Sequence, residues 1–212
     1  MTSPKSEKLI DVARKLFEAE GFHTTGIDRV LAEAGVAKMT LYNNFGSKDG
    51  LIVAVLNKSS NEMIARLKHI ITEASNDPCE QILGVFDALA MWFSDPEFCG
   101  CMFQAAVAEF PDPQSEPAQA ARAHQVAVAS MFAELCTTAE LPDPQALGQM
   151  LAMIASGAMC TARQTQTREP ADHARQIAEI LLERACSASF TPPHAAPPTN
   201  ASPNCDQPIK NH

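Results

Sequence analysis

Long apolar runs are absent from this sequence of 212 residues. No stretch approaches the roughly 20 apolar residues that a membrane-spanning helix needs. The polar residues 1–7 are not followed by the apolar run of a secretory signal peptide. The seven cysteines are odd in number and scattered among Ala, Leu and Met, which favours reduced, mostly buried thiols over a disulfide framework. We therefore expect a soluble, cytoplasmic protein.

The motifs that mark several enzyme classes are missing as well. The sequence holds no Gly-rich phosphate loop, no Gly-x-Ser-x-Gly nucleophile elbow and no His-Glu-x-x-His zinc motif. Its carboxylates are spread along helix faces that we expect to be solvated. The sequence therefore predicts no catalysis and no cofactor, and it offers no familiar metal-ligand spacing.

Positive charge is scarce beyond the first 58 residues. The net charge is −9, but residues 1–58 carry eight basic and seven acidic residues, whereas the rest of the chain carries eight and eighteen. So acidic a chain is not expected to bind nucleic acid over its whole surface. A charge-balanced N-terminal segment on an acidic body still allows one end of the molecule to contact DNA.

Alternating β-branched runs are also missing, and Ala, Leu, Met, Glu and Gln dominate, so the chain is expected to be all helix. A first helix stops at Gly21, and a cap formed by Thr25 and Asp28 opens a second helix that Gly35 ends. Ser47 is expected to cap a long fourth helix. The other helices are expected at about 38–44, from Asp77-Pro78 onward, and at about 102–109, 117–139, 145–164 and 170–186.

The stretch from Phe22 to Leu51 carries the most informative pattern. Two helices of about eight residues each are joined by a turn at residues 34–37, as in a helix-turn-helix. Gly35 supplies the turn geometry, and Val36 can fill the gap between the helices. The second helix of this motif is built to lie in the major groove of DNA. The competing interpretation is a small bundle with a structural role only.

The second helix of this motif is unusually polar for its length. Leu41 and Phe45 lie at i and i+4 and can face the core. The remaining side chains offer an amine, two amides, two hydroxyls and an apolar contact, which suit base edges and phosphates. These residues are Lys38, Met39, Thr40, Tyr42, Asn43 and Asn44. Ser47 and Lys48 begin the next helix, where free amides and an amine can hold a phosphate.

This stretch closely resembles the DNA-binding domain of the TetR family of bacterial transcription regulators. The matching residues are Thr-Thr-x-Ile-Asp at 24–28, Ala-Gly-Val at 34–36, Leu-Tyr at 41–42 and Phe-x-Ser-Lys-Asp-x-Leu at 45–51. The resemblance covers about residues 5–60. It implies a three-helix DNA-binding domain at residues 4–64, with the helix-turn-helix at about 26–45, and a larger helical effector-binding and dimerisation domain at 65–187. The Pro-rich segment 188–212 is expected to be disordered.

The resemblance also implies roles for single residues. Thr25 and Gly26 are expected to contact the DNA backbone, and Tyr42 and Lys48 to grip phosphates. The residues expected to face bases are Lys38, Met39, Thr40 and Asn43. The implied protein is a homodimeric repressor that holds a palindromic double-stranded operator and is released by a small-molecule effector.

The last two helices carry more apolar surface than one monomer is expected to cover. TetR-like proteins pair such helices across a two-fold axis as a four-helix bundle. The expected interface residues are Ile154, Ile177, Ile180 and Leu181.

The effector domain is less specific in sequence. Aromatic and Met side chains of its central helices are expected to line an effector cavity or, alternatively, to form plain core. They are Phe86, Trp92, Phe93, Phe103, Met131 and Phe132. His124 is a candidate polar contact in the same cavity, or else a solvated side chain.

The pattern Gly100-Cys101 followed by Glu109-Phe110-Pro111 is similar to one branch of TetR-like regulators and identifies no ligand. Cys99 and Cys101 allow two interpretations. Either they are small packing residues beside Gly100, or they are accessible thiols whose modification releases the DNA. A thiol-switched regulator is therefore the alternative function, followed by an enzyme or a structural helical protein.

Overall fold

The computed structural model describes residues 4–187, which form nine α-helices and no strand. The helices are α1 (Pro4–Glu20), α2 (Ile27–Ala34), α3 (Lys38–Phe45), α4 (Lys48–Ala74), α5 (Pro78–Phe93), α6 (Met102–Glu109), α7 (Glu116–Thr138), α8 (Pro144–Thr165) and α9 (Glu169–Cys186). The predicted all-α fold class is confirmed. The expectation of a disordered segment at 188–212 lies outside the described residues.

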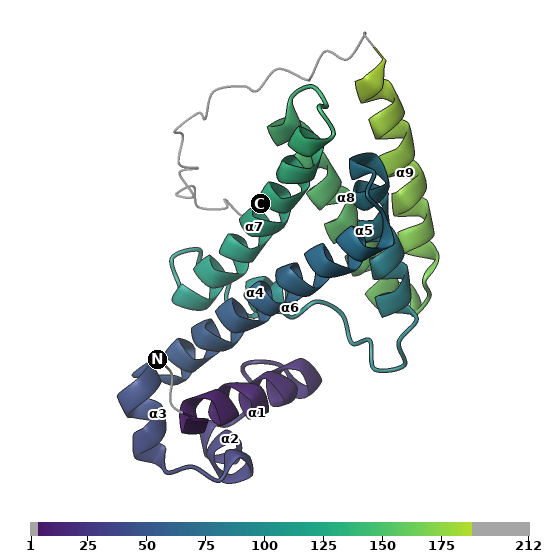
Figure 1. Ribbon diagram of the computed structural model, residues 1–212. Coiled ribbons are helices and arrows are strands. Elements are labelled where there is room, and N and C mark those ends of the chain that lie inside the picture. Colours follow the sequence, from purple (N-terminus) through teal and green to yellow (C-terminus); the bar gives the residue numbers. More distant parts are fainter. Residues whose placement is uncertain (1–3, 188–212) are drawn as a thin grey trace, which may run out of the picture.

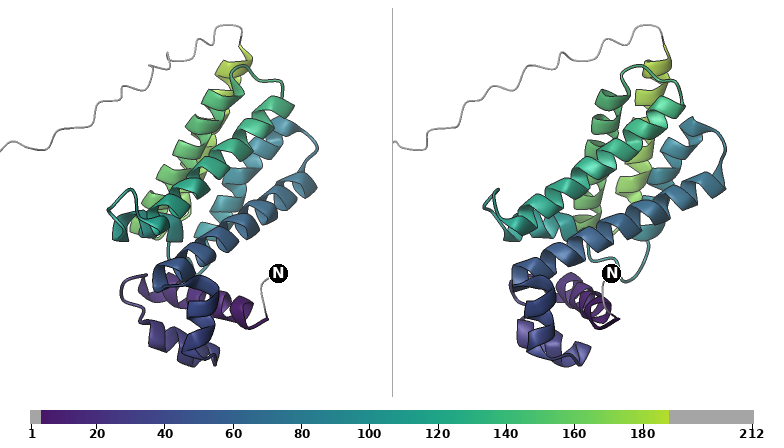
Figure 2. Two further views of the ribbon diagram at one scale, coloured as in Figure 1. Left: turned by 90° about the vertical axis from the view of Figure 1, so that its left-hand side faces the viewer. Right: turned by 60° about the vertical axis from the view of Figure 1, so that its left-hand side comes forward.

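The helices are arranged as a small bundle beneath a larger body. Figure 1 shows α1, α2 and α3 gathered at one end of the molecule, while α4 runs from them into the body that α5, α7, α8 and α9 form. Both views in Figure 2 show the same division. Within residues 4–187, no helix is long and apolar enough to span a membrane.

Several helix ends follow from single residues that the sequence marks. The Ser47 hydroxyl accepts a hydrogen bond from the Gly50 amide at 2.9 Å and caps α4. The Asp77 carboxylate accepts one from the Cys79 amide at 2.8 Å and caps α5. Gly35 ends α2 with a φ of 65°, in the left-handed region that glycine tolerates best. These caps fix where the turns of the N-terminal bundle lie.

The predicted cap at the start of α2 is wrong. The N-cap residue is Gly26, and no side chain caps this end of the helix. The Thr25 hydroxyl instead donates to the carbonyl oxygens of Gly21 at 2.7 Å and Leu16 at 3.3 Å. Its side chain is fully buried. The two hydrogen bonds stabilise the α1–α2 loop from within, so the hydroxyl does not cap α2.

Two hydrophobic cores hold the molecule together, and α4 takes part in both. The first core joins α1–α3 and the N-terminal half of α4, but it also contains Phe103 and Ala106 of α6 and Ala121 of α7. The second core lies among α5, α7, α8 and α9. Because α6 packs into the first core, the end of the larger body nearest the N-terminal bundle shares that core with it.

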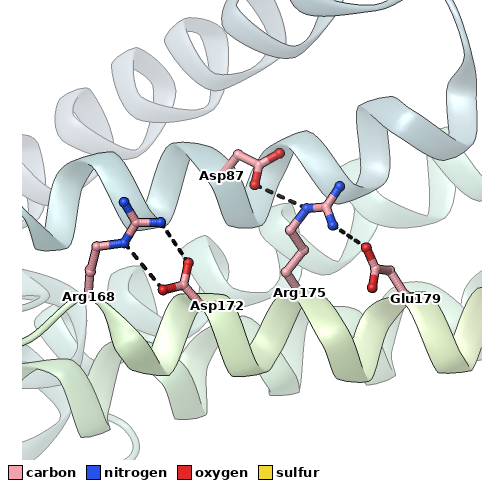
Figure 3. Close-up of polar contacts among 5 residues, drawn as sticks. All are labelled: Asp87, Arg168, Asp172, Arg175 and Glu179. Atoms are coloured by element: carbon pink, nitrogen blue, oxygen red, sulfur yellow. Dashed lines mark hydrogen bonds and ion pairs between the residues drawn. The ribbon is translucent and has the colours of Figure 1, made fainter.

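Ion pairs and a close helix contact fix the two C-terminal helices. Figure 3 shows Arg175 reaching from α9 to Asp87 of α5, where Nε and Oδ1 lie 3.1 Å apart. Arg168 and Asp172 pair one turn earlier on α9, and this pairing lowers the pKa of the Asp172 carboxyl. Helix α8 meets α7 at Gly148, where a side chain would collide with the backbone of α7. This packing leaves the opposite faces of α8 and α9 exposed.

Candidate DNA-binding and effector sites

The helix-turn-helix is built on a few buried apolar residues. The Gly35 amide donates to the Ala32 carbonyl, and the Val36 amide donates to the Leu31 carbonyl, so the chain turns tightly between α2 and α3. Leu41 is completely buried and anchors α3 on the first core. With its inner face fixed in this way, α3 presents its other side chains to solvent.

The exposed face of α3 carries the residues predicted to read DNA. Met39 and Tyr42 are 66% and 47% exposed, so both side chains are open to a binding partner. Lys38 and Asn43 are also exposed, and Thr40 is half-buried. These residues are therefore accessible on α3, with Thr40 the least exposed of them, and their contacts with DNA stay a prediction.

Two polar side chains of this region, Lys38 and Asn44, already contact other groups of the protein. Lys38 Nζ lies 3.2 Å from Asp28 Oδ1 of α2, and both side chains are largely exposed, so the pair is weak and open to exchange for a DNA contact. The Asn44 amide donates to the Thr40 carbonyl at 2.6 Å and so lies along its own helix. Asn43 is the freer of the two adjacent amides.

The residues predicted to contact the DNA backbone differ in how exposed they are. Gly26 is exposed, and Lys48 is half-buried with Nζ donating to the His23 carbonyl at 3.3 Å. Lys48 therefore stands beside the α1–α2 loop at the start of α4. The Thr25 prediction is wrong for its side chain, which is buried and hydrogen-bonded inside the loop. Thr24 is the exposed threonine at this place.

The predicted effector residues do not gather in one place. Phe86 stacks on Phe132 with ring centroids 5.9 Å apart, and both lie in the second core with Phe93 and Met131. Trp92 is half-buried against that core. Two surface hollows of about 500 Å³ are present, one between α8 and α9 and one between the first turns of α4 and α7, and none of the predicted effector residues lines either.

Phe103 and His124 form a separate polar and aromatic cluster. Their rings stack with centroids 3.6 Å apart. Ser60 Oγ of α4 lies 2.8 Å from His124 Nδ1. Burial lowers the pKa of His124 to about 4, so the ring is neutral at physiological pH. The neighbouring Ser59 hydroxyl is buried and has no hydrogen-bond partner among the described residues. Neither serine was predicted, since sequence periodicity alone reads them as ordinary helix positions.

The two candidate redox cysteines lie in different surroundings. Cys99 is exposed, whereas Cys101 is buried in the first core. Burial raises the pKa of the Cys101 thiol, although the amides of Gln104 and Phe103 and the nearby Arg163 act in the opposite direction. The helix N-terminus therefore does not make Cys101 an accessible thiolate. Within residues 4–187, no group of three His, Cys, Asp or Glu side chains is placed to hold a metal ion.

The predicted dimer residues lie on an uncovered apolar face. Ile177 and Ile180 of α9 are 52% and 58% exposed, and Met153 of α8 is 66% exposed. Ile154 and Leu181 are half-buried. The hollow between α8 and α9 is lined in part by Ile154 and Ile177. Apolar side chains of both helices therefore meet at this hollow.

Comparisons with known proteins agree with this layout. A family model described as bacterial regulatory proteins of the tetR family matches residues 9–55. The HTH-type transcriptional regulator YjdC of Escherichia coli is 22% identical over 176 residues, which are 83% of this chain and 92% of YjdC. The reduced form of NemR from Escherichia coli is 22% identical and shares the fold with a TM-score of 0.77, over 84% of this chain and 96% of that one.

A further solved structure carries the assignment. SCO4454, a TetR-family transcriptional regulator from Streptomyces coelicolor, is 31% identical with a TM-score of 0.76. The match covers 85% of this chain and 96% of SCO4454, so it extends over both the helix-turn-helix and the helical body. The relatives are regulators of transcription rather than enzymes. With the helix-turn-helix, the exposed α3 and these relatives in agreement, the chain belongs to the TetR family of DNA-binding transcription regulators.

Proposed function

We propose that this protein is a homodimeric repressor that binds a palindromic operator and leaves it when a small-molecule effector binds. The observation that carries the proposal is α3, which is held by buried Leu41 and presents Lys38, Met39 and Asn43 outward. This set combines a cation, an apolar contact and an amide, which together can discriminate base edges in the major groove.

The exposed face of α8 and α9 supports the dimer. Pairing this face with its copy across a two-fold axis would bury Met153, Ile177 and Ile180. A two-fold dimer presents two α3 helices to successive major grooves, about 34–36 Å apart. An effector that prefers another spacing of the two helices lowers operator affinity by population shift.

The cluster around His124 is the place where we expect the effector to act. It combines an aromatic ring, a neutral imidazole and the Ser60 hydroxyl, and the preceding residue, Ser59, carries a buried hydroxyl without a partner among the described residues. A buried hydroxyl without a partner is costly, and a polar group of a ligand would satisfy it. Compounds that release the wild-type protein from DNA should therefore lose their effect on Ser59→Ala or His124→Phe variants.

Selection of DNA by the purified full-length protein tests the proposal. Duplexes with a random central segment are bound, recovered and sequenced over several rounds. We expect an inverted repeat whose half-sites are centred about 10–10.5 base pairs apart, or a multiple of that distance. Recovery of sequences without two-fold symmetry would contradict the dimeric mode, and recovery of no shared sequence would contradict specific binding.

The thiol-switch alternative is less well supported. Only Cys99 of the pair is exposed, and the pKa of Cys101 is raised by burial, so rapid oxidation of the two thiols to a disulfide by peroxide is not favoured. Mass spectrometry after mild peroxide treatment distinguishes the two functions. A disulfide or sulfenic acid at Cys99 or Cys101 that accompanies loss of DNA binding would favour the switch.

A further inference from the structure

The motif Glu109-Phe110-Pro111 ends α6, and it meets the DNA-binding bundle at the α1–α2 loop. The Glu109 carboxylate accepts hydrogen bonds from the backbone amides of Phe22 at 3.0 Å and His23 at 2.6 Å. These residues are 87 and 86 positions apart from Glu109 in sequence. One carboxylate therefore holds two consecutive amides of a loop that belongs to the other half of the molecule.

The contact is reinforced on both sides of the carboxylate. The His23 ring nitrogen Nε2 lies 2.7 Å from the Glu109 carbonyl oxygen, to which it can donate. The ring of Phe110 packs on those of His23 and Phe22, with centroids 4.8 Å and 6.0 Å away. At Gly21, where φ is +87°, an added Cβ would come within 3.0 Å of a Glu109 oxygen. The loop thus fits Glu109 closely.

The same loop is tied down by hydrogen bonds and leads directly to α2 of the helix-turn-helix. The Thr25 hydroxyl ties the loop to the Gly21 carbonyl from inside. Lys48, a predicted phosphate contact, donates to the His23 carbonyl at 3.3 Å. The loop also runs into Gly26, the N-cap of α2. Any shift of residues 21–25 relative to the body therefore moves the helix-turn-helix with it.

We propose that Glu109 is a positioning residue: it holds the helix-turn-helix at one orientation on the body and thereby sets the spacing of the two α3 helices in the dimer. This inference rests on the proposed function. Charge-assisted hydrogen bonds to backbone amides are stronger and more directional than neutral ones, which suits a fixed joint. Phe103 of the His124 cluster and Glu109 lie on the same eight-residue helix, α6. Helix α6 therefore connects the expected effector site with the joint, by which we mean the contact of Glu109 with the amides of Phe22 and His23.

Binding to DNA of different half-site spacings tests this role. The inverted repeat selected by the wild-type protein is rebuilt with one or two base pairs added or removed at its centre. For Glu109→Ala, we expect affinity for the selected spacing to fall about tenfold, as for a coupling lost between two sites, and the preference for that spacing over the altered spacings to weaken. Affinity for unrelated duplex DNA should not change, since α3 and Lys48 remain intact.

Three further variants make the result specific. Glu109→Gln keeps one acceptor oxygen, so its affinity for the selected spacing should lie between those of the wild type and Glu109→Ala. His23→Ala removes the ring contacts with Glu109 and Phe110 at an exposed position. It should also lower the affinity for the selected spacing. Glu97→Ala, an exposed carboxylate of the α5–α6 loop, is the matched control and should behave as the wild type. An unchanged spacing preference in Glu109→Ala would overturn the inference, as would an equal loss on every duplex.

Hydrogen exchange tests the joint without DNA, so its failure is separable from failure of the proposed function. In Glu109→Ala we expect faster amide exchange at residues 22–23 and through α2 and α3, with α8 unchanged. Equal exchange in both proteins would overturn the inference. If the wild type selects no inverted repeat, the proposed function fails, while the exchange result still decides whether Glu109 restrains the loop.

Discussion

His124 is the residue at which burial has the largest consequence for pH dependence. Its pKa is lowered to about 4 in the folded protein, against an ordinary value of 6.5. The unfolded chain therefore binds a proton to this ring at a higher pH than the folded protein does. Above pH 6.5 the ring is neutral in both states, so folding does not have to remove a proton from it. This contribution is lost as the pH falls from 6.5 toward 4.

We predict that wild-type stability falls by about 2 kcal/mol more between pH 7.5 and pH 5 than that of His124→Gln, from this group alone. Urea unfolding at the two pH values measures the difference. His69→Gln changes an exposed histidine of α4 and serves as the control, with the pH response of the wild type. An unchanged pH response in His124→Gln would show that another group is responsible.

Lys48 has a different role, since its expected partner is a phosphate that every DNA sequence shares. Lys48→Ala should weaken binding to all duplexes and reduce the salt dependence of log K by about one unit. Lys68→Ala, which removes an exposed amine paired with Glu134 far along α4, should leave that slope unchanged. Titrations at several salt concentrations give both slopes, and equal slopes for Lys48→Ala and wild type would refute the phosphate contact.

Sequence reasoning at this scale succeeded where a residue acts locally. Leu41 and Met39 were placed correctly inside and outside α3 because helical periodicity alone separates them. The role of Glu109 was missed, because its partners lie more than 80 residues away and are backbone amides. The sequence expectation also joined Phe86 and Phe103, although they lie in different cores, because periodicity does not say which helices meet.

At the scale of helices, α7 and α8 lie close together at Gly148. A Cβ built on Gly148 would lie 2.7 Å from the Ala129 carbonyl oxygen and 2.7 Å from the Ala133 amide nitrogen. Backbone atoms of a packed helix cannot move aside cheaply. The glycine therefore sets how closely the two helices can pack.

We predict that Gly148→Ala destabilises the protein by about 1–3 kcal/mol through overpacking, even though alanine favours helices by about 1 kcal/mol over glycine. Gly84→Ala in α5 is the matched substitution, since its Cβ would meet Ile71 only at an ordinary 3.5 Å. That variant should be neutral or more stable. Thermal unfolding compares the two, and a Gly148→Ala protein as stable as Gly84→Ala would contradict this packing argument.

Helix boundaries were predictable because capping chemistry is local. Ser47 and Asp77 cap α4 and α5 as expected, and α6 occupies residues 102–109 as predicted. The exception is Thr25, whose hydroxyl has two competing acceptors, the carbonyl of Leu16 in α1 and that of Gly21 in the loop. Those carbonyls become available only once α1 and the loop have folded, so the sequence pattern favoured the wrong partner.

At the scale of the whole molecule, the uncovered face of α8 and α9 is expected to form the dimer. Ile180→Glu places a charge on this face and should produce monomers that keep their helical content but lose tight operator binding. Met91→Glu changes a side chain that is 74% exposed on α5 and should remain dimeric. Analytical ultracentrifugation at micromolar concentration gives the mass of each protein. A wild type that sediments as a monomer would contradict the dimer and the operator geometry derived from it.

Helix α3 is expected to read bases in both half-sites of an operator, and Asn43→Ala removes one of the expected base contacts. Asn43 is exposed on α3 and makes a predicted base contact, whereas the fold does not depend on its side chain. DNA selection with this variant should return the wild-type inverted repeat with the preference relaxed at one position in each half-site, symmetrically, at a cost of about 1–3 kcal/mol. A variant that selects the same sequence with undiminished preference at every position would contradict the account.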